Sequence, residues 1–130
     1  MLMLMYRSRA LQIAGLLLAL FPTHSIAQQT AADGERVFRT QCGACHSVEA
    51  GQNRLGPHLA GIMGRKAGSV EGARYSPALK ASTIVWNEET LATFLANPRE
   101  LVPGTTMTIG VRNEDQRAAI IAYLKSLSEN

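Results

Sequence analysis

The segment Cys42-Gly43-Ala44-Cys45-His46 has the residue types and the spacing to do chemistry. Two thiols three positions apart, followed at once by an imidazole, are the attachment signature of a c-type haem. The thiols can add across the haem vinyl groups as thioethers, and His46 can then supply an axial nitrogen to the iron. A disulfide, a redox-active thiol pair or half of a zinc site remain as alternatives. Because the chain has only two cysteines, a four-cysteine zinc site is excluded.

A second iron ligand would come from another histidine or from a methionine, or the position would have no protein ligand. Beyond the N-terminal segment the candidates are His58, Met63 and Met107. Met107 follows Pro103-Gly104 in a polar, turn-forming segment between two expected helices, where a lone methionine has no helix to pack in. We therefore interpret Met107 as the ligand. Met63 is interpreted as a gap-filling core residue and His58 as a loop histidine, and both remain alternatives.

The N-terminus has the pattern of an export signal. Two arginines precede an apolar run over residues 10–21, and small residues follow at Ser25-Ile26-Ala27. The apolar run is shorter than the roughly twenty residues that span a bilayer. We predict a cleaved signal peptide over 1–27, one domain over 28–130 and a periplasmic location, with an uncleaved anchor as the alternative.

The charge of the chain gives little sign of a nucleic-acid partner. The whole chain has 13 basic and 10 acidic side chains, a formal charge of +3. Arg7 and Arg9 lie in the predicted signal, so 11 basic side chains and a net charge of +1 remain. A balance so near neutrality predicts no binding to nucleic acid. A domain of this size has a modest apolar core, which a covalently held haem would reinforce.

The remaining pattern favours helices joined by loops rich in glycine and proline, with no convincing alternating strand. We therefore predict an all-α fold. Residues 51–73, with several glycines, are expected to be loop. The expected helices cover 33–41 with Asp33 as N-cap, 76–80, 88–96 between Asn87 and Asn97-Pro98, and 114–127 after Asn113.

These motifs resemble those of the class I c-type cytochromes, in the branch that includes mitochondrial cytochrome c and its bacterial relatives. The resemblance covers residues 33–127. It implies the small cytochrome c fold, with four to five helices wrapped around one covalently bound haem c. Besides the cysteine motif, the matches are Gly34-x-x-x-Phe38, Gly56-Pro57-His58-Leu59-x-Gly61, Gly64-Arg65-Lys66-x-Gly68, Tyr75-Ser76, Trp86-Asn87-Glu88, Leu95-x-Asn97-Pro98, Pro103-Gly104-Thr105-x-Met107 and Ile121-Ala122-Tyr123-Leu124.

The resemblance assigns roles at the predicted haem. It implies that Cys42 and Cys45 are the thioether anchors and that His46 and Met107 are the axial ligands. Pro57 matches the residue whose carbonyl accepts the imidazole N–H, a bond that orients such a ring and makes it a better donor.

Further matches concern the haem propionates and the helix packing. Arg65, Tyr75 and Trp86 match residues that hydrogen-bond the buried propionate region, although plain core packing also suits Tyr75 and Trp86. Gly34 and Phe38 match a close contact between the first and last helices, opposite Ile120 and Tyr123.

The chain also departs from the family pattern at three positions. Phe94 stands where a tyrosine is frequent, Leu79 where an asparagine is common, and Thr106 where a lysine often precedes the ligand methionine. The first two changes predict a drier distal side of the haem with altered internal waters. The third weakens any expectation of a lysine-ringed docking face.

The function that the resemblance implies is that of a soluble periplasmic electron carrier rather than an enzyme. One electron would pass through a His/Met-ligated haem. The expected partners are a membrane oxidoreductase complex or periplasmic dehydrogenase and a terminal acceptor, with transient docking to membrane proteins and a monomeric state. The alternatives are a cytochrome subunit of a periplasmic dehydrogenase and a peroxidase-like or gas-binding haem protein.

Overall fold

The computed structural model describes residues 26–129, and it confirms the predicted all-α class. Within residues 26–129 the only strand-like pairing is one isolated bridge, from Lys66 to Val85. The predicted signal peptide lies mostly outside the described residues, which contain only its last two positions. The helices are α1 (Ile26–Gln41), α2 (Pro77–Ala81), α3 (Glu88–Ala96), α4 (Pro98–Leu101) and α5 (Glu114–Ser126).

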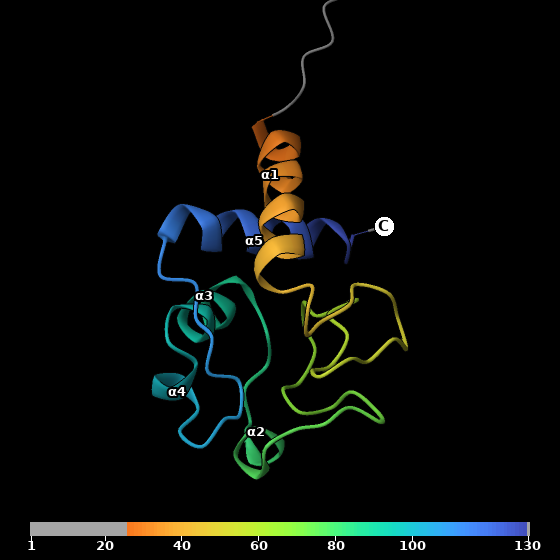
Figure 1. Cartoon of the computed structure of the whole chain (residues 1–130), viewed down its shortest axis with the longest axis vertical. Helices are drawn as coiled ribbons and strands as arrows, with labels where there is room; N and C mark the ends of the chain where they lie inside the picture. Colours follow the sequence, from red (N-terminus) through yellow and green to blue (C-terminus); the bar gives the residue numbers. More distant parts are fainter. Residues whose placement is uncertain (1–25, 130) are drawn as a thin grey trace, which may run out of the picture.

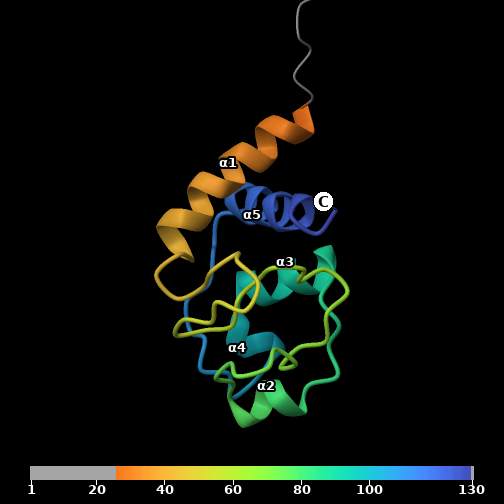
Figure 2. The same ribbon diagram turned by 90° about the vertical axis from the view of Figure 1, so that its right-hand side faces the viewer.

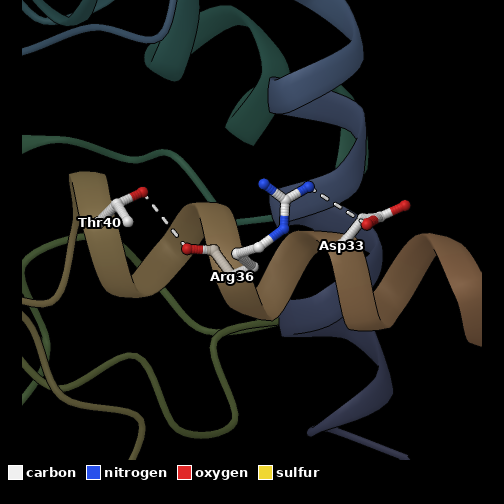
Figure 3. A network of polar contacts seen from close by, with 3 residues as sticks. All are labelled: Asp33, Arg36 and Thr40. Carbon is white, nitrogen blue, oxygen red and sulfur yellow. Dashed lines mark hydrogen bonds and ion pairs between the residues drawn. The ribbon is translucent and has the colours of Figure 1, made fainter.

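Helix α1 begins at Ile26, so the predicted start at Asp33 was wrong. Alanine and glutamine dominate the turns before Asp33, and both favour a helix. Asp33 lies inside α1 rather than at its cap, and its Oδ1 is 3.3 Å from Nη2 of Arg36. The hydroxyl of Thr40 donates to the Arg36 carbonyl at 3.3 Å (Figure 3). These contacts lie on the exposed side of α1, where an ion pair contributes little to stability.

The opposite side of α1 crosses α5 at close range, at one end of the molecule (Figures 1 and 2). Gly34 makes the crossing possible, because a Cβ at this position would lie 1.9 Å from the carbonyl oxygen of Ala119. The rings of Phe38 and Tyr123 pack with their centroids 5.8 Å apart. The expected contact with Tyr123 is therefore present. Gly34 meets the backbone of Ala119, while its neighbour Ile120 is buried in the core.

Helix α3 starts and ends where the sequence predicts, but α4 was not expected. The Asn87 side chain accepts a bond from the Thr90 amide at 2.8 Å, and the Thr90 hydroxyl accepts one from the Asn87 amide at 2.9 Å. This reciprocal pair is a capping box. Pro98 cannot continue α3, yet its fixed φ suits the first turn of a helix. The same dipeptide, Asn97-Pro98, therefore ends α3 and starts α4.

Side-chain caps also fix the starts of the two other predicted helices. Ser76 Oγ accepts from the Leu79 amide at 3.1 Å at the start of α2. Asn113 Oδ1 accepts from the Gln116 amide at 2.9 Å at the start of α5. These bonds satisfy backbone donors that have no partner inside the helix. Helix α2 lies at the end of the molecule away from the α1–α5 crossing (Figure 1).

Between these two ends the helices share one core with the connecting segments. Helix α5 packs against both α1 and α3, and α3 also contacts α4. Two long segments, 42–76 and 102–113, contain no helix and run from one end of the molecule toward the other. The core residues are Val37, Phe38, Ile62, Ala67, Trp86, Leu91, Phe94, Leu95, Val102, Val111, Ile120, Ile121 and Leu124.

Candidate functional site

A cavity of about 270 Å³ lies between the helices and the two long connecting segments. Neither His58 nor Met63, the two alternative ligands, belongs to its lining. Met63 packs against the core cluster, and His58 Nδ1 is buried without a hydrogen-bond partner in the described part of the chain. Every predicted site residue does line the cavity, namely Cys42, Cys45, His46, Pro57, Arg65, Tyr75, Trp86 and Met107.

The two thiols and the imidazole are presented by a tight turn at the end of α1. The Cys42 amide donates to the Phe38 carbonyl at 2.8 Å, which continues the helical pattern past Gln41. The amides of Cys45 and His46 then donate to the Cys42 carbonyl at 3.0 and 2.9 Å. The turn therefore brings the three side chains to the same cavity.

The orientation of the His46 ring is set by Pro57. His46 Nδ1 lies 2.7 Å from the Pro57 carbonyl oxygen. A carbonyl can only accept, so Nδ1 carries the proton and the lone pair stays on Nε2. Burial lowers the pKa of His46 below its usual value; the bond to Pro57 opposes this shift and the charge of Arg65 adds to it. The neutral imidazole is the form that can ligate a metal.

Gly56 packs directly against this ring, a role that the sequence analysis did not assign. A Cβ at Gly56 would lie 2.4 Å from His46 Cε1, closer than any side chain tolerates. The Gly56 amide also donates to the Cys45 carbonyl at 2.8 Å. The glycine before Pro57 could have suggested a close approach of the backbone to another group. Only the folded chain identifies that group as the imidazole.

The Arg65 side chain holds the segment after Pro57 in place through two hydrogen bonds to its backbone. Its Nη1 donates to the Ala60 carbonyl and its Nη2 to the His58 carbonyl, both at 2.9 Å. Burial lowers the pKa of Arg65, although the nearby Tyr75 opposes this shift. The two carbonyls carry no net charge, so these bonds do not neutralise the positive charge of the guanidinium. It can therefore still pair with an anion in the cavity.

Tyr75 and Trp86 complete this side of the lining. The Tyr75 hydroxyl accepts a bond from the Val70 amide at 3.1 Å. The Trp86 indole is buried against Phe94, with ring centroids 5.1 Å apart. Phe94 and Leu79 also line the cavity, at the two positions where the family more often has polar residues.

Met107 reaches the cavity from the other long segment, between α4 and α5. Its amide donates to the Thr105 hydroxyl at 3.3 Å, and Thr105 is itself buried. The segment is attached at both ends, since the Val102 amide donates to Pro98 and the Val111 amide donates to Leu95, at 3.0 and 2.7 Å. Met107 is partly buried and packs against the core cluster.

The electrostatics of the Cys42 thiol argue against it as the nucleophile of a redox-active pair. Burial, followed by the effect of the nearby Cys45, raises the pKa of the Cys42 thiol to about 11. A thiol that attacks disulfides needs a lowered pKa, because the thiolate is the nucleophile. Cys42 therefore stays protonated near neutral pH and is a poor redox nucleophile.

The residues fit a covalently attached haem. The cavity offers two free thiols, an imidazole nitrogen with a free lone pair and a methionine sulfur. Nitrogen and thioether sulfur are donors that haem iron accepts. Arg65 adds a partly buried positive charge, which suits the carboxylates of a haem, while Leu79 and Phe94 suit its apolar ring.

Comparisons with known proteins agree with this fit. The family described as cytochrome c matches residues 31–128. Cytochrome c2 iso-2 of Magnetospirillum fulvum is 51% identical over 87 residues, which cover 66% of this chain and 91% of the relative. Cytochrome c2 iso-2 of Magnetospirillum molischianum is 48% identical over 68% of this chain and 92% of the relative.

A fungal relative is similar over a slightly longer stretch. Cytochrome c of Gibberella zeae is 47% identical over 94 residues, covering 71% of this chain and 89% of that protein. The residues that the family model matches, 31–128, contain the whole cavity lining, from Gln41 to Leu124. The chain belongs to the cytochrome c family, as a class I c-type cytochrome whose cofactor is covalently bound haem c.

Proposed function

We propose that this electron carrier works in the periplasm, with Cys42 and Cys45 as its thioether anchors and His46 and Met107 as its axial ligands. One observation carries the assignment: these four side chains, and neither His58 nor Met63, line one cavity. The relatives named cytochrome c2 and cytochrome c support the role of carrier. We also propose that the chain passes an electron between redox partner proteins without transforming a substrate of its own, and so is not an enzyme.

The chain contributes the surroundings of the redox centre. Haem iron, when bound, supplies a one-electron couple. The soft Met107 sulfur favours the ferrous state relative to a second imidazole. Leu79 and Phe94 contribute apolar lining to the cavity, and an apolar surrounding would disfavour the more highly charged ferric state. Ligation by thioether sulfur rather than by a second imidazole would raise the reduction potential.

The loop around His46 keeps the geometry constant while the charge changes. Pro57 fixes the ring through its carbonyl, and Gly56 packs against the ring. Arg65 braces the same loop through two backbone carbonyls. A ligand that is held in this way moves little between oxidation states, so the reorganisation energy of electron transfer stays small.

The proposed location rests on the N-terminal pattern. We propose that residues 1–27 are a cleaved signal peptide and residues 28–130 the mature domain. Across residues 26–129, no helix is long and apolar enough to cross a membrane. The mass of the mature protein tests this proposal, since an N-terminus at Gln28 is expected and a retained residue 1 would indicate an anchor.

A spectrum tests the ligand assignment directly. We expect the ferric protein to show the weak long-wavelength band of a methionine-ligated haem. Carbon monoxide added to the ferrous protein should leave its spectrum unchanged, because both axial positions are filled. A missing band together with ready carbon monoxide binding would reject Met107 as the ligand. The peroxidase-like or gas-binding alternative would then be favoured.

The partners follow from the same chemistry. We propose that the protein acts as a monomer between a membrane oxidoreductase complex or periplasmic dehydrogenase and a terminal acceptor. Sedimentation of the haem-loaded protein at micromolar concentration should give the mass of one chain. A stable complex that co-purifies with a dehydrogenase would instead indicate a dedicated subunit.

A further inference from the structure

Asn53 lies outside the cavity and joins two parts of the long connecting segment. Its Nδ2 donates to the Glu71 carbonyl at 3.0 Å, and its Oδ1 accepts from the His58 amide at 3.0 Å. A carbonyl can only accept and a backbone N–H can only donate, so the two partners determine which end of the Asn53 amide is the oxygen. Both ends of this side chain are therefore used.

One of these bonds reaches the peptide group that orients the imidazole. The N–H of His58 and the carbonyl of Pro57 belong to the same peptide group. This group is trans, so its N–H and its carbonyl point in opposite directions. The N–H meets Asn53 Oδ1, and the carbonyl oxygen lies 2.7 Å from His46 Nδ1. Asn53 therefore holds one side of a peptide group whose other side holds the ring.

Arg65 acts on other peptide groups of the same loop. It donates to the carbonyls of His58 and Ala60, and neither is the carbonyl that bonds to the imidazole. The two side chains thus have different tasks. Arg65 braces the loop as a whole, whereas Asn53 acts on the one peptide group that contacts His46.

The bonds around Asn53 form a continuous chain. His46 Nδ1 donates to the Pro57 carbonyl, and the same peptide group donates through its N–H to Asn53. The Asn53 amide in turn donates to the Glu71 carbonyl. Each amide in this chain accepts at its oxygen and donates at its nitrogen, so the dipoles align head to tail. Such a chain polarises its members and strengthens each bond by roughly 10–30%.

We propose that Asn53 is a positioning residue for the redox centre, which strengthens the hydrogen bond from His46 to Pro57 and thereby lowers the reduction potential. This inference rests on the proposed function, because it takes His46 as an axial ligand. A stronger bond at Nδ1 makes the imidazole a better electron donor at Nε2. A better donor stabilises ferric iron relative to ferrous iron, and hydrogen bonds of this kind are one means by which a protein sets a haem potential. Asn53 thus acts in the opposite sense to the Met107 sulfur.

Three haem-loaded variants separate this electronic effect from a simple loosening of the loop. Asn53→Ala removes both bonds of the side chain. Asn53→Asp keeps an oxygen for the His58 amide but loses the donor to the Glu71 carbonyl. Gly72→Ala keeps the Asn53 side chain but strains the backbone beside Glu71, because Gly72 has a φ of +71° and its Cβ would lie 3.7 Å from Asn53 Nδ2.

The first readout is the reduction potential, measured by equilibration with a redox dye at about 1 M salt, where charges are screened over roughly 3 Å. Screening keeps the added carboxylate of Asn53→Asp from dominating the result. Asn53→Ala should shift the ratio of ferrous to ferric protein about threefold toward ferrous, as for a modest change in one bond. This ratio corresponds to a potential that is higher by about 30 mV. Asn53→Asp and Gly72→Ala should not raise the potential, although all three variants should raise the unfolding equilibrium constant about tenfold.

The second readout is the NMR resonance of the His46 Nδ1 proton in the ferrous protein, which does not depend on electron transfer. A weaker hydrogen bond moves such a resonance upfield. We expect an upfield shift for Asn53→Ala and none for Asn53→Asp or Gly72→Ala. An equal rise in potential for all three variants would show that Asn53 only stabilises the loop, and it would overturn the proposal. An unchanged potential and an unchanged resonance in Asn53→Ala would overturn it as well.

The wild-type protein separates a failure of this inference from a failure of the proposed function. If it shows a reversible one-electron couple that Asn53→Ala leaves unchanged, only the positioning role is refuted. If it shows no reversible couple, or if its iron is not ligated by His46, the proposed function is refuted and this inference with it.

Discussion

The two sides of the cavity are held in different ways. On the imidazole side, the Pro57 carbonyl bonds to His46, the Gly56 backbone packs against its ring, and Arg65 braces the following loop. On the methionine side, the Met107 amide bonds only to the Thr105 hydroxyl, at 3.3 Å. Local contacts thus orient the imidazole, whereas the methionine depends on how the whole segment packs.

The anchoring of the methionine segment explains this difference. Backbone bonds hold Val102 to α4 and Val111 to the end of α3, and both valines are buried. Met107 lies in the middle, where exposed threonines surround it. A segment that is fixed at its ends and exposed at its centre opens at a lower free energy than a braced one. We therefore expect the methionine side to open first.

The largest loss of stability should come from breaking the imidazole side with Gly56→Ala. The added Cβ would lie 2.4 Å from His46 Cε1, so the ring or the loop must move. We expect the free energy of unfolding of the haem-loaded protein to fall by about 3 kcal/mol, together with a lower yield of attached haem. Denaturant unfolding and the haem content measure both effects.

Gly61→Ala is the matched control for that variant. A Cβ at Gly61 meets no atom within 4 Å, but its φ of +63° strains an alanine. This strain should cost only about 1 kcal/mol. Equal losses for the two variants would show that contact with the imidazole is unimportant.

Arg65→Met removes the brace on the same side and should have the next largest effect. Two carbonyls, of His58 and Ala60, lose a charged donor. We expect a loss of about 2–3 kcal/mol in the free energy of unfolding, in the upper part of what a hydrogen bond to a charged group contributes. Arg54→Met, which removes an exposed guanidinium, should cost about 0.5 kcal/mol. An equal loss in the free energy of unfolding for Arg54→Met and Arg65→Met would contradict the bracing role of Arg65.

Met107→Ala should open the methionine side while leaving the haem attached. Truncating this partly buried side chain should cost about 2 kcal/mol of stability. The substitution should also vacate one axial position of the iron. The ferrous protein should then bind carbon monoxide and gain peroxidase activity. Met63→Ala removes a methionine outside the cavity and should destabilise the protein similarly without carbon monoxide binding. Carbon monoxide binding by the Met63 variant alone would reverse the ligand assignment.

The smallest effect is expected from Thr105→Val, which keeps the shape but removes the hydroxyl that accepts from Met107. The loss should be about 1 kcal/mol, as for one neutral hydrogen bond. If the methionine side opens first, this variant should also bind carbon monoxide faster than the wild type. Thr106→Val, at the exposed neighbouring position, should change neither the thermal midpoint nor the binding rate. A larger effect at Thr106 would contradict the role of the hydroxyl.

Much of the helical structure could be predicted because local chemistry determines it. Ser76, Asn87 and Asn113 cap their helices through bonds to amides only three residues away, so their positions are visible in the sequence. The start of α1 was missed because Asp33 resembles a cap but lies inside a helix that alanine and glutamine extend to Ile26. Helix α4 was missed because Asn97-Pro98 was interpreted only as a stop.

The amino-acid sequence by itself determined the chemistry of the chain, because Cys42, Cys45 and His46 lie within five consecutive residues and their spacing suits one haem. Only the tertiary structure decided which distant groups surround them. The contact between Gly56 and the imidazole and the brace from Arg65 arise from how the loop after the cysteine motif folds back on itself, and Leu55 and Ile109 come to line one cavity from the two different long connecting segments. Such contacts depend on how the segments pack, which local spacing does not encode.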